Sequence, residues 1–302
     1  MALRSLDNAL PTTPERPKKI AKIYLPISKP SDLPINNENL APLPVSAEPA
    51  IEYIPSEYLK ELSDPDVQIQ SLIEGLESKD WMKVCESINT ARRIALYHST
   101  LLLPNLDKVM VILVKAMKNP RSALIKTSVM AASDIFKSYG HDLLESPTSE
   151  AFDQMLLQLL LKSSQDKRFV CEEADKTLLV MVGSIPPLPL LNKLKAFVSH
   201  TNPRVRAKAA VSFAHCVSKM GLEMMKEFGL VALVRNVAEL LNDRLPEARE
   251  AARSTVTVIY EAFTSSEEQK ASELSAAEYW QDFCSANLSP IQAQSLIKIV
   301  SV

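Results

Sequence analysis

Three segments of the chain repeat one spacing of apolar residues, and this repetition limits the possible folds more than any other feature of the sequence. In each segment the apolar residues stand at offsets 0, 4, 8, 11 and 15, which is one face of an α-helix. The three sets are Val170, Ala174, Leu178, Met181 and Ile185; Val205, Ala209, Phe213, Cys216 and Met220; and Ala248, Ala252, Val256, Ile259 and Phe263. Each such helix leaves an apolar face that only a neighbouring copy can cover. The pattern therefore predicts an all-α protein of stacked repeats, an α-solenoid.

The repeats extend over most of the chain. Amphipathic segments follow one another in pairs, and a short polar turn divides each pair. The expected pairs are about 66–77 with 81–97, 102–118 with 121–139, 149–162 with 168–182, 188–200 with 203–220, 222–241 with 246–263, and 271–286 with 290–300. Equivalent turn positions at Trp81, Arg121, Arg168, Arg204 and Arg244 are 40, 47, 36 and 40 residues apart, which is the period of two-helix solenoid repeats. We therefore expect six helix pairs in residues 66–302.

The first 65 residues have a different character. They hold 11 of the 20 prolines of the chain and show no helical period. Proline breaks the helical hydrogen-bond ladder, and the segment has few bulky apolar groups to bury. We expect residues 1–65 to form a disordered arm. No apolar run of signal-peptide length follows Arg4, and nowhere do 18 apolar residues run together, so we expect neither a signal peptide nor a membrane span.

Composition and spacing argue against an enzyme, a cofactor and a metal site. The chain has only 5 glycines, and none belongs to a phosphate-binding glycine motif. His98, His141, His200 and His215 stand singly, without a second ligand at metal-binding spacing. No nucleophile and base can be paired from their spacing. We expect a non-catalytic protein that uses neither a cofactor nor a metal.

The cysteines indicate the cellular compartment, and the charge balance limits the class of partner. The cysteines stand far apart in apolar helical contexts, without a C-x-x-C motif, which predicts reduced, buried thiols of a cytosolic protein. They are Cys85, Cys171, Cys216 and Cys284. The 34 basic and 36 acidic residues give a net charge of −2, which argues against nucleic-acid binding through a global basic surface but permits a local basic edge.

Four stretches resemble those of known helical-repeat families. NPRVRAKAA at 202–210 and DRLPEAREAA at 243–252 are similar to HEAT repeats, in which a polar turn leads into a second helix that opens with apolar, Arg and small residues. SKDWMK at 78–83, in a helix that continues to residue 93, resembles the first repeat of TOG domains, above all those of the CLASP type and of ciliary TOG-array proteins. NPRSALIK at 119–126 resembles the second repeat. The resemblance covers roughly residues 66–300, the size of one TOG domain.

The resemblance implies a paddle-shaped array whose intra-repeat turns lie along one narrow edge, which in TOG domains binds αβ-tubulin. Each of five turns here carries a cation, and one carries a tryptophan. Arg and Lys can pair with the acidic surface of tubulin, and Trp can fill an apolar pocket. The expected tubulin-binding residues are Lys79, Trp81, Arg121, Lys167, Arg168, Arg204 and Arg244.

The expected function is therefore that of a non-catalytic microtubule-associated protein in the cytoplasm. It would bind αβ-tubulin or microtubules and regulate microtubule dynamics, with a further protein partner or the arm at 1–65 supplying multivalency. One alternative stays open, namely a HEAT or armadillo adaptor that holds another protein's peptide on its concave face. No nucleic-acid or membrane partner is expected.

Several of these residues have more than one interpretation. Trp81 is four residues from Cys85, a spacing that suits a core residue as well as a partner anchor. Arg121 departs from the family, whose second turn usually offers a small or apolar contact. Lys167 and Arg168 also fit a solvated turn.

Two further arginines stand inside second helices rather than in turns. We expect Arg206 and Arg249 to form structural bonds between neighbouring repeats.

Overall fold

The computed structural model describes residues 53–301, except 141, 146, 165 and 267–272. The chain divides into two units, 1–48 and 49–302, and every described residue belongs to the second. This unit is built from helices, and its described residues contain no β-strand. The elements are η1 (Ser56–Tyr58), α1 (Pro65–Leu76), α2 (Trp81–Tyr97), α3 (Ser99–Leu102), η2 (Leu103–Asn105), α4 (Leu106–Met117), α5 (Ser122–Tyr139), α6 (Ser149–Lys162), α7 (Arg168–Ser184), α8 (Pro187–Val198), α9 (Pro203–Val217), α10 (Leu222–Phe228), α11 (Leu230–Leu240), α12 (Pro246–Thr264), α14 (Ala276–Asn287) and α15 (Pro290–Val300).

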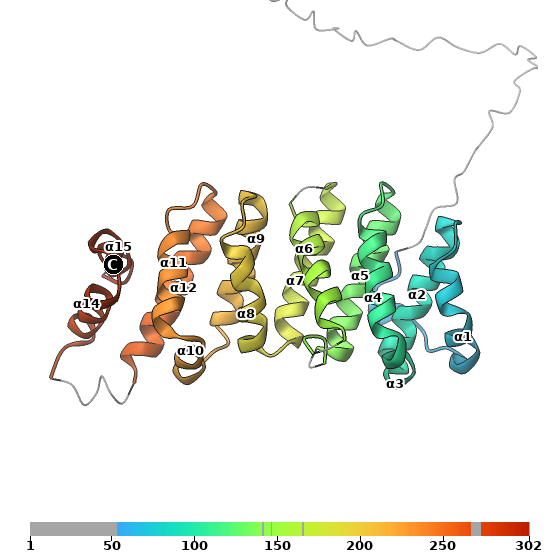
Figure 1. Ribbon diagram of the computed structural model, residues 1–302, viewed down its shortest axis with the longest axis horizontal. Helices are drawn as coiled ribbons and strands as arrows, with labels where there is room; N and C mark the ends of the chain where they lie inside the picture. Colours follow the sequence, from blue (N-terminus) through green and yellow to red (C-terminus); the bar gives the residue numbers. More distant parts are fainter. Residues whose placement is uncertain (1–52, 141, 146, 165, 267–272, 302) are drawn as a thin grey trace, which may run out of the picture. The chain divides into compact units, whose positions relative to one another are not determined.

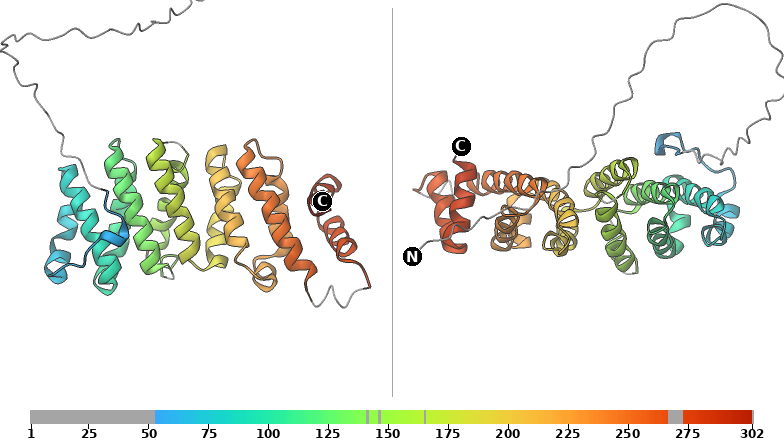
Figure 2. Two further views of the ribbon diagram at one scale, coloured as in Figure 1. Left: turned by 180° about the vertical axis from the view of Figure 1, so that it is seen from behind. Right: turned by 90° about the horizontal axis from the view of Figure 1, so that it is seen from above.

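The helices form pairs that stack side by side (Figure 1). The pairs are α1 with α2, α4 with α5, α6 with α7, α8 with α9, α11 with α12, and α14 with α15. The second helices of successive pairs pack directly on one another, from α2 through α5, α7, α9 and α12 to α15. Seen from above, first and second helices make two layers (Figure 2, right). The predicted α-solenoid of six helix pairs is confirmed.

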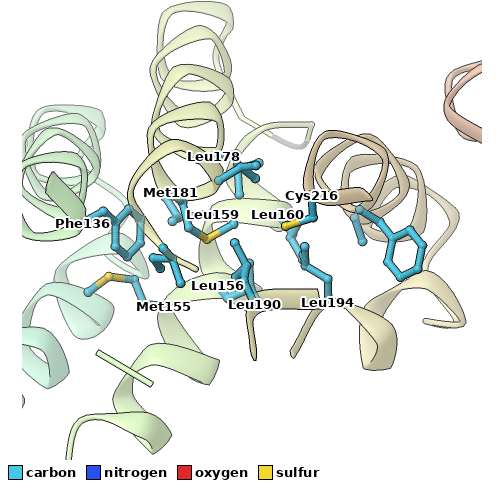
Figure 3. Packing of buried hydrophobic residues seen from close by; sticks show 14 of the residues in the cluster. Phe136, Met155, Leu156, Leu159, Leu160, Leu178, Met181, Leu190, Leu194 and Cys216 are labelled. Carbon is cyan, nitrogen blue, oxygen red and sulfur yellow. The ribbon is translucent and has the colours of Figure 1, made fainter. Parts of the chain in front are cut away.

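The repeated apolar stripe is the inner face of the second layer. All fifteen of its residues, in α7, α9 and α12 and just beyond the C-terminal ends of α7 and α9, are at most 6% exposed. Figure 3 shows how side chains of α6, α7, α8 and α9 fill the space between the layers, with Leu159 and Leu160 close to Met181 and Cys216. Each buried Leu, Met or Phe side chain contributes about 1.5–3 kcal/mol of transfer free energy relative to an exposed one. The stripe therefore holds the pairs together.

The polar and proline-containing turns set the helix ends. The side chain of Asp80 accepts a hydrogen bond from the backbone N–H of Met82 at 2.9 Å, and Asn202 accepts one from Arg204 at 3.0 Å. Ser275 and Ser289 begin α14 and α15 with capping boxes. Proline stands in the first turn of α1, α8, α9, α12 and α15, where its missing N–H costs no helical bond.

Two expected helices are interrupted. The segment 102–118 begins with the last residue of α3 and with η2, which contains Pro104, and the regular helix α4 starts only at Leu106. The segment 222–241 is divided into α10 and α11 at Gly229, which has φ of 99°. A side chain is strained at that φ, so glycine allows the chain to change direction there.

The expectation of a disordered arm is wrong for residues 53–64, which we call the strap. The strap crosses the second helices α2 and α5 (Figure 2, left). Leu59 is only 2% exposed, and its carbonyl accepts a hydrogen bond from the Tyr97 hydroxyl at 2.6 Å. The ring of Tyr53 lies 4.6 Å from the Lys126 ammonium. Residues 1–52 of the predicted arm lie outside the described part of the chain.

A buried ion pair explains why the strap is held. Arg92 of α2 donates from Nε to Asp134 of α5 at 2.7 Å, and both side chains are fully buried. The strap supplies two further partners, since Arg92 Nη1 donates to the Ile54 carbonyl at 2.9 Å and the Ser56 hydroxyl donates to Asp134 at 2.5 Å, while Asn89 of α2 also accepts from Arg92 Nη1 at 3.0 Å. A buried ion pair is costly unless its remaining polar atoms are paired. The strap therefore completes a site between the first two repeats.

The four cysteines agree in part with the expectation of buried thiols. Cys85, Cys216 and Cys284 are buried, and burial raises the pKa of Cys216 and of Cys284 to about 12. Cys171 is only half-buried, because it lies one turn into α7, beside the turn that precedes that helix.

Among the described residues, no helix has the length and apolar character needed to cross a membrane.

A substitution at Gly140 tests how closely α5 packs on α7. A Cβ atom at this position would lie 2.3 Å from the Ser184 carbonyl oxygen, whereas one at Gly183 would meet nothing within 4 Å. We predict that Gly140→Ala lowers the free energy of unfolding by roughly 1–3 kcal/mol, since backbone must move to relieve the overlap. Gly183→Ala, inside α7, should leave it unchanged or raise it by up to about 1 kcal/mol. Urea unfolding of both variants checks this, and equal effects would contradict the packing.

Candidate protein-binding edge

The turn within each helix pair lies on the same side of the array, along the upper edge in Figure 1. We call this the turn edge. It comprises the first turn at 77–80, the second at 118–121, the third at 163–167 apart from the undescribed residue 165, the fourth at 199–202, the fifth at 241–245 and the sixth at 288–289, with the first residues of the helices that follow. Because the second helices pack in register, they fix the spacing between successive turns.

The first and second turns are joined by Trp81 and Arg121. The Arg121 guanidinium lies 5.5 Å from the centre of the Trp81 ring, a cation–π distance. Trp81 is half-buried and packs against the core, as the core interpretation predicts, while its role as a partner anchor stays a prediction. Together with Lys79, these two residues line a hollow of about 380 Å³. The structure therefore brings three of the predicted site residues together.

The third turn is partly neutralised. Arg168 is 93% exposed, and its Nε donates to Glu172 at 2.8 Å. This hydrogen bond and the charge of Glu172 raise the pKa of Arg168 above its ordinary value. Lys167 is exposed, and its backbone N–H donates to Asp166 at 2.7 Å. Of all the turns, this one most resembles an ordinary solvated loop.

The fourth and fifth turns each present an exposed arginine. Arg204 and Arg244 have no carboxylate partner in the described part of the chain, and the same is true of Lys79 and Lys167. Arg204 stands in the first turn of α9, where the helix dipole disfavours a cation. Within the described residues, its charge is therefore neither paired with a carboxylate nor favoured by the helix dipole.

A second set of arginines supports these turns from beneath. Arg206 of α9 pairs with the buried Asp243 of the fifth turn and donates from Nη1 to the His200 carbonyl at 2.6 Å. It therefore joins neighbouring repeats, as predicted. Arg249 donates to the carbonyls of Asp243 and Arg244 at 2.8 and 3.0 Å, so it braces the turn of its own repeat instead.

The exposed side of the second helices α2, α5, α7, α9 and α12, which we call the second-helix face, carries a pair of salt bridges that was not predicted from the sequence. We call it the Lys208 bracket. Lys208 of α9 bridges Asp175 of α7 at 3.1 Å and Glu247 of α12 at 2.8 Å. Burial works to lower the pKa of Lys208, but its bonds to the two carboxylates raise it above the ordinary value, while burial raises the pKa of Asp175. The partners are 33 and 39 residues away, one repeat period to each side. Only the repeat register, applied to charged positions, could have paired them.

The side chains of the turn edge are of kinds that bind a protein partner. The edge offers exposed cations at fixed spacing and one partly exposed aromatic ring. Within the described residues, no group of three or more His, Cys, Asp or Glu side chains is placed to hold a metal ion.

Comparison with known proteins places this fold. Residues 94–278 match the family described as CLASP N terminal. TOG array regulator of axonemal microtubules protein 1 of Mus musculus is 29% identical over 173 residues, which is 57% of this chain and 10% of the mouse protein. The matched part therefore spans about a tenth of that relative's length.

Solved structures show the same architecture. The TOG domain of Zyg9 from C. elegans superposes with a TM-score of 0.56 at 15% identity, covering 82% of this chain and 91% of the other. A crescerin structure gives 0.52 at 14% identity, covering 76% and 87%. These identities are low, so the two structures show a shared fold.

The pair beneath the turn edge gives a direct test. We predict that Asp243→Ala lowers the free energy of unfolding by about 2 kcal/mol, because it leaves Arg206 and the Leu245 N–H, which donates to Asp243 at 2.8 Å, without their acceptor. Glu250→Ala removes an exposed pair with Arg253 and should cost under about 0.5 kcal/mol. Urea unfolding measures both, and similar losses would show that the turn is not braced in this way.

Proposed function

Since the chain belongs to the CLASP N-terminal family, we propose that it is a non-catalytic, microtubule-associated protein of the cytoplasm. It binds αβ-tubulin through the turn edge and thereby regulates microtubule dynamics. A further protein partner supplies multivalency, because one domain of this size offers a single edge.

The relatives support the class of partner. The mouse relative is named as a regulator of axonemal microtubules, and the crescerin structure is described as a TOG array that regulates microtubules in the primary cilium. The aligned segment is a small part of the mouse protein.

The observation that carries the proposal is the contrast between two sets of cations. Arg92, Arg206 and Lys208 are paired with carboxylates inside the array. By contrast, the turn-edge cations Lys79, Lys167, Arg204 and Arg244 are exposed and have no carboxylate partner among the described residues. Cations that the fold does not use remain available to an acidic partner, whose approach they accelerate at low salt.

The rigidity of the array adds selectivity. The stripe, the Arg206–Asp243 pair and the Lys208 bracket fix successive turns relative to one another. A rigid row of cations favours a rigid surface with carboxylates at matching spacing, because neither partner loses much conformational freedom on binding.

The adaptor alternative rests on a different surface. The second-helix face has a hollow of about 220 Å³ beside Leu179, which is 54% exposed, and Val211. Asp175, Lys208 and Glu247, which are already engaged with one another, line the same hollow. The strap also covers this face at α2 and α5. These contacts occupy part of the face on which a peptide would lie.

A charge-reversal pair tests the proposal. We predict that Arg204→Glu combined with Arg244→Glu weakens binding to αβ-tubulin at least tenfold in gel filtration at low salt, because two attractive contacts become repulsive. Arg253→Glu combined with Lys298→Glu changes the net charge equally, at exposed positions away from the turns, and should bind like the wild type. Circular dichroism should show unchanged helix content in both.

The control pair and the wild-type protein show whether the turn edge is responsible for binding. Equal loss in both pairs would mean that net charge acts rather than the edge. Wild-type protein that binds neither free tubulin nor microtubules at low salt would eliminate the proposed function.

A further inference from the structure

The hollow beside the first two turns reaches beyond the turn edge onto α4. Its volume is about 380 Å³, enough for a large side chain. Its walls come from α1, α2, α4 and α5 and from the first two turns, and about half of the lining residues are apolar. They include Leu76, Trp81, Val84, Val111, Ile112 and Leu124. Val111 is 51% exposed, an apolar side chain left open beside a concave apolar surface.

The charges around this hollow have one prevailing sign. Lys79, Lys115 and Arg121 line it, and none has a carboxylate partner among the described residues. The acidic lining residue Glu77 is 3.3 Å from the ammonium of Lys108, so its charge is already offset. An occupant with a carboxylate next to its apolar part would match both the walls and the rim.

The contact between Trp81 and Arg121 gives the hollow its shape. The guanidinium stacks over the ring at 5.5 Å, so that the tryptophan is held as a wall between the first and second turns. Trp81 is thus half-buried and already has a partner on one face. It is less suited to leaving its site and entering a pocket on another protein than to lining a pocket of its own.

We infer that this hollow receives an apolar side chain of αβ-tubulin that is flanked by a carboxylate. Val111 and Lys115 of α4 then belong to the interface together with the turns, and Arg121 is the residue that positions Trp81. The inference rests on the proposed function, since it names a contact within the same complex. It also gives Arg121 a role that the family pattern does not supply.

Cysteine protection tests occupancy at the hollow. Val111→Cys introduces a thiol there, and Leu179→Cys is the matched control, since Leu179 is 54% exposed on the second-helix face. Each full-length variant is treated with a maleimide, alone and with saturating αβ-tubulin, and peptide mass spectrometry follows labelling at that position. We expect tubulin to slow labelling at position 111 about tenfold or more and at position 179 less than twofold, because an occupied hollow excludes the reagent.

Complex formation is confirmed for each variant by gel filtration, which separates the possible failures. A complex in which both positions react as they do in the free protein overturns the hollow and leaves the proposed function standing. Protection at position 179 alone overturns the hollow in favour of peptide binding on the second-helix face. A wild-type protein that forms no complex eliminates the proposed function, and this inference with it.

Discussion

The packing of one apolar stripe on the next is the interaction on which the rest of the structure depends. The second helices α7, α9 and α12 bury apolar residues at the same five offsets, one repeat after another. The contact therefore fixes both the register and the direction of successive pairs. Charged contacts follow that register: Lys208 reaches one repeat to either side, and Arg206 reaches the next turn. Without the stripe, none of these partners would meet.

The turn edge is a consequence of the same packing. Helix pairs in one register place every intra-repeat turn on one side, so cations 36–47 residues apart in sequence become neighbours along an edge. A chain of net charge −2 thus presents local positive charge without being basic as a whole. The strap and the Lys208 bracket lie on the second-helix face. The surfaces that the fold itself uses and the surface left for a partner are therefore different.

Local signals predicted most of the fold. Asp80 predicts the start of α2, and Pro290 predicts the start of α15. The apolar period predicts the extent of α6. The strap could not be predicted, because it has no period and is held by contacts with residues 36–78 positions away. The division of segment 222–241 into α10 and α11 depends on the positive φ of Gly229, and a single glycine in a helical segment does not indicate such a φ.

The candidate site was predicted as a set of residues but not as an arrangement. All seven predicted positions lie in the turns or at the helix starts beside them. Sequence spacing could not foresee that Arg121 stacks on Trp81 or that α4 contributes to the hollow, because both depend on side chains from separate repeats. The pair of Arg168 and Glu172, by contrast, has the four-residue spacing of neighbours on one helix and could have been predicted.

The central claim is that the turn edge is the surface that meets αβ-tubulin. Hydrogen exchange of the chain with and without tubulin measures this most directly, because it reports every backbone segment at once. The account predicts slower exchange at 77–84, 118–124, 199–206 and 241–248, with unchanged exchange in the connections between pairs at 142–148 and 218–222. Protection confined to the exposed faces of α7, α9 and α12, or protection at those connections instead of the turns, would contradict it.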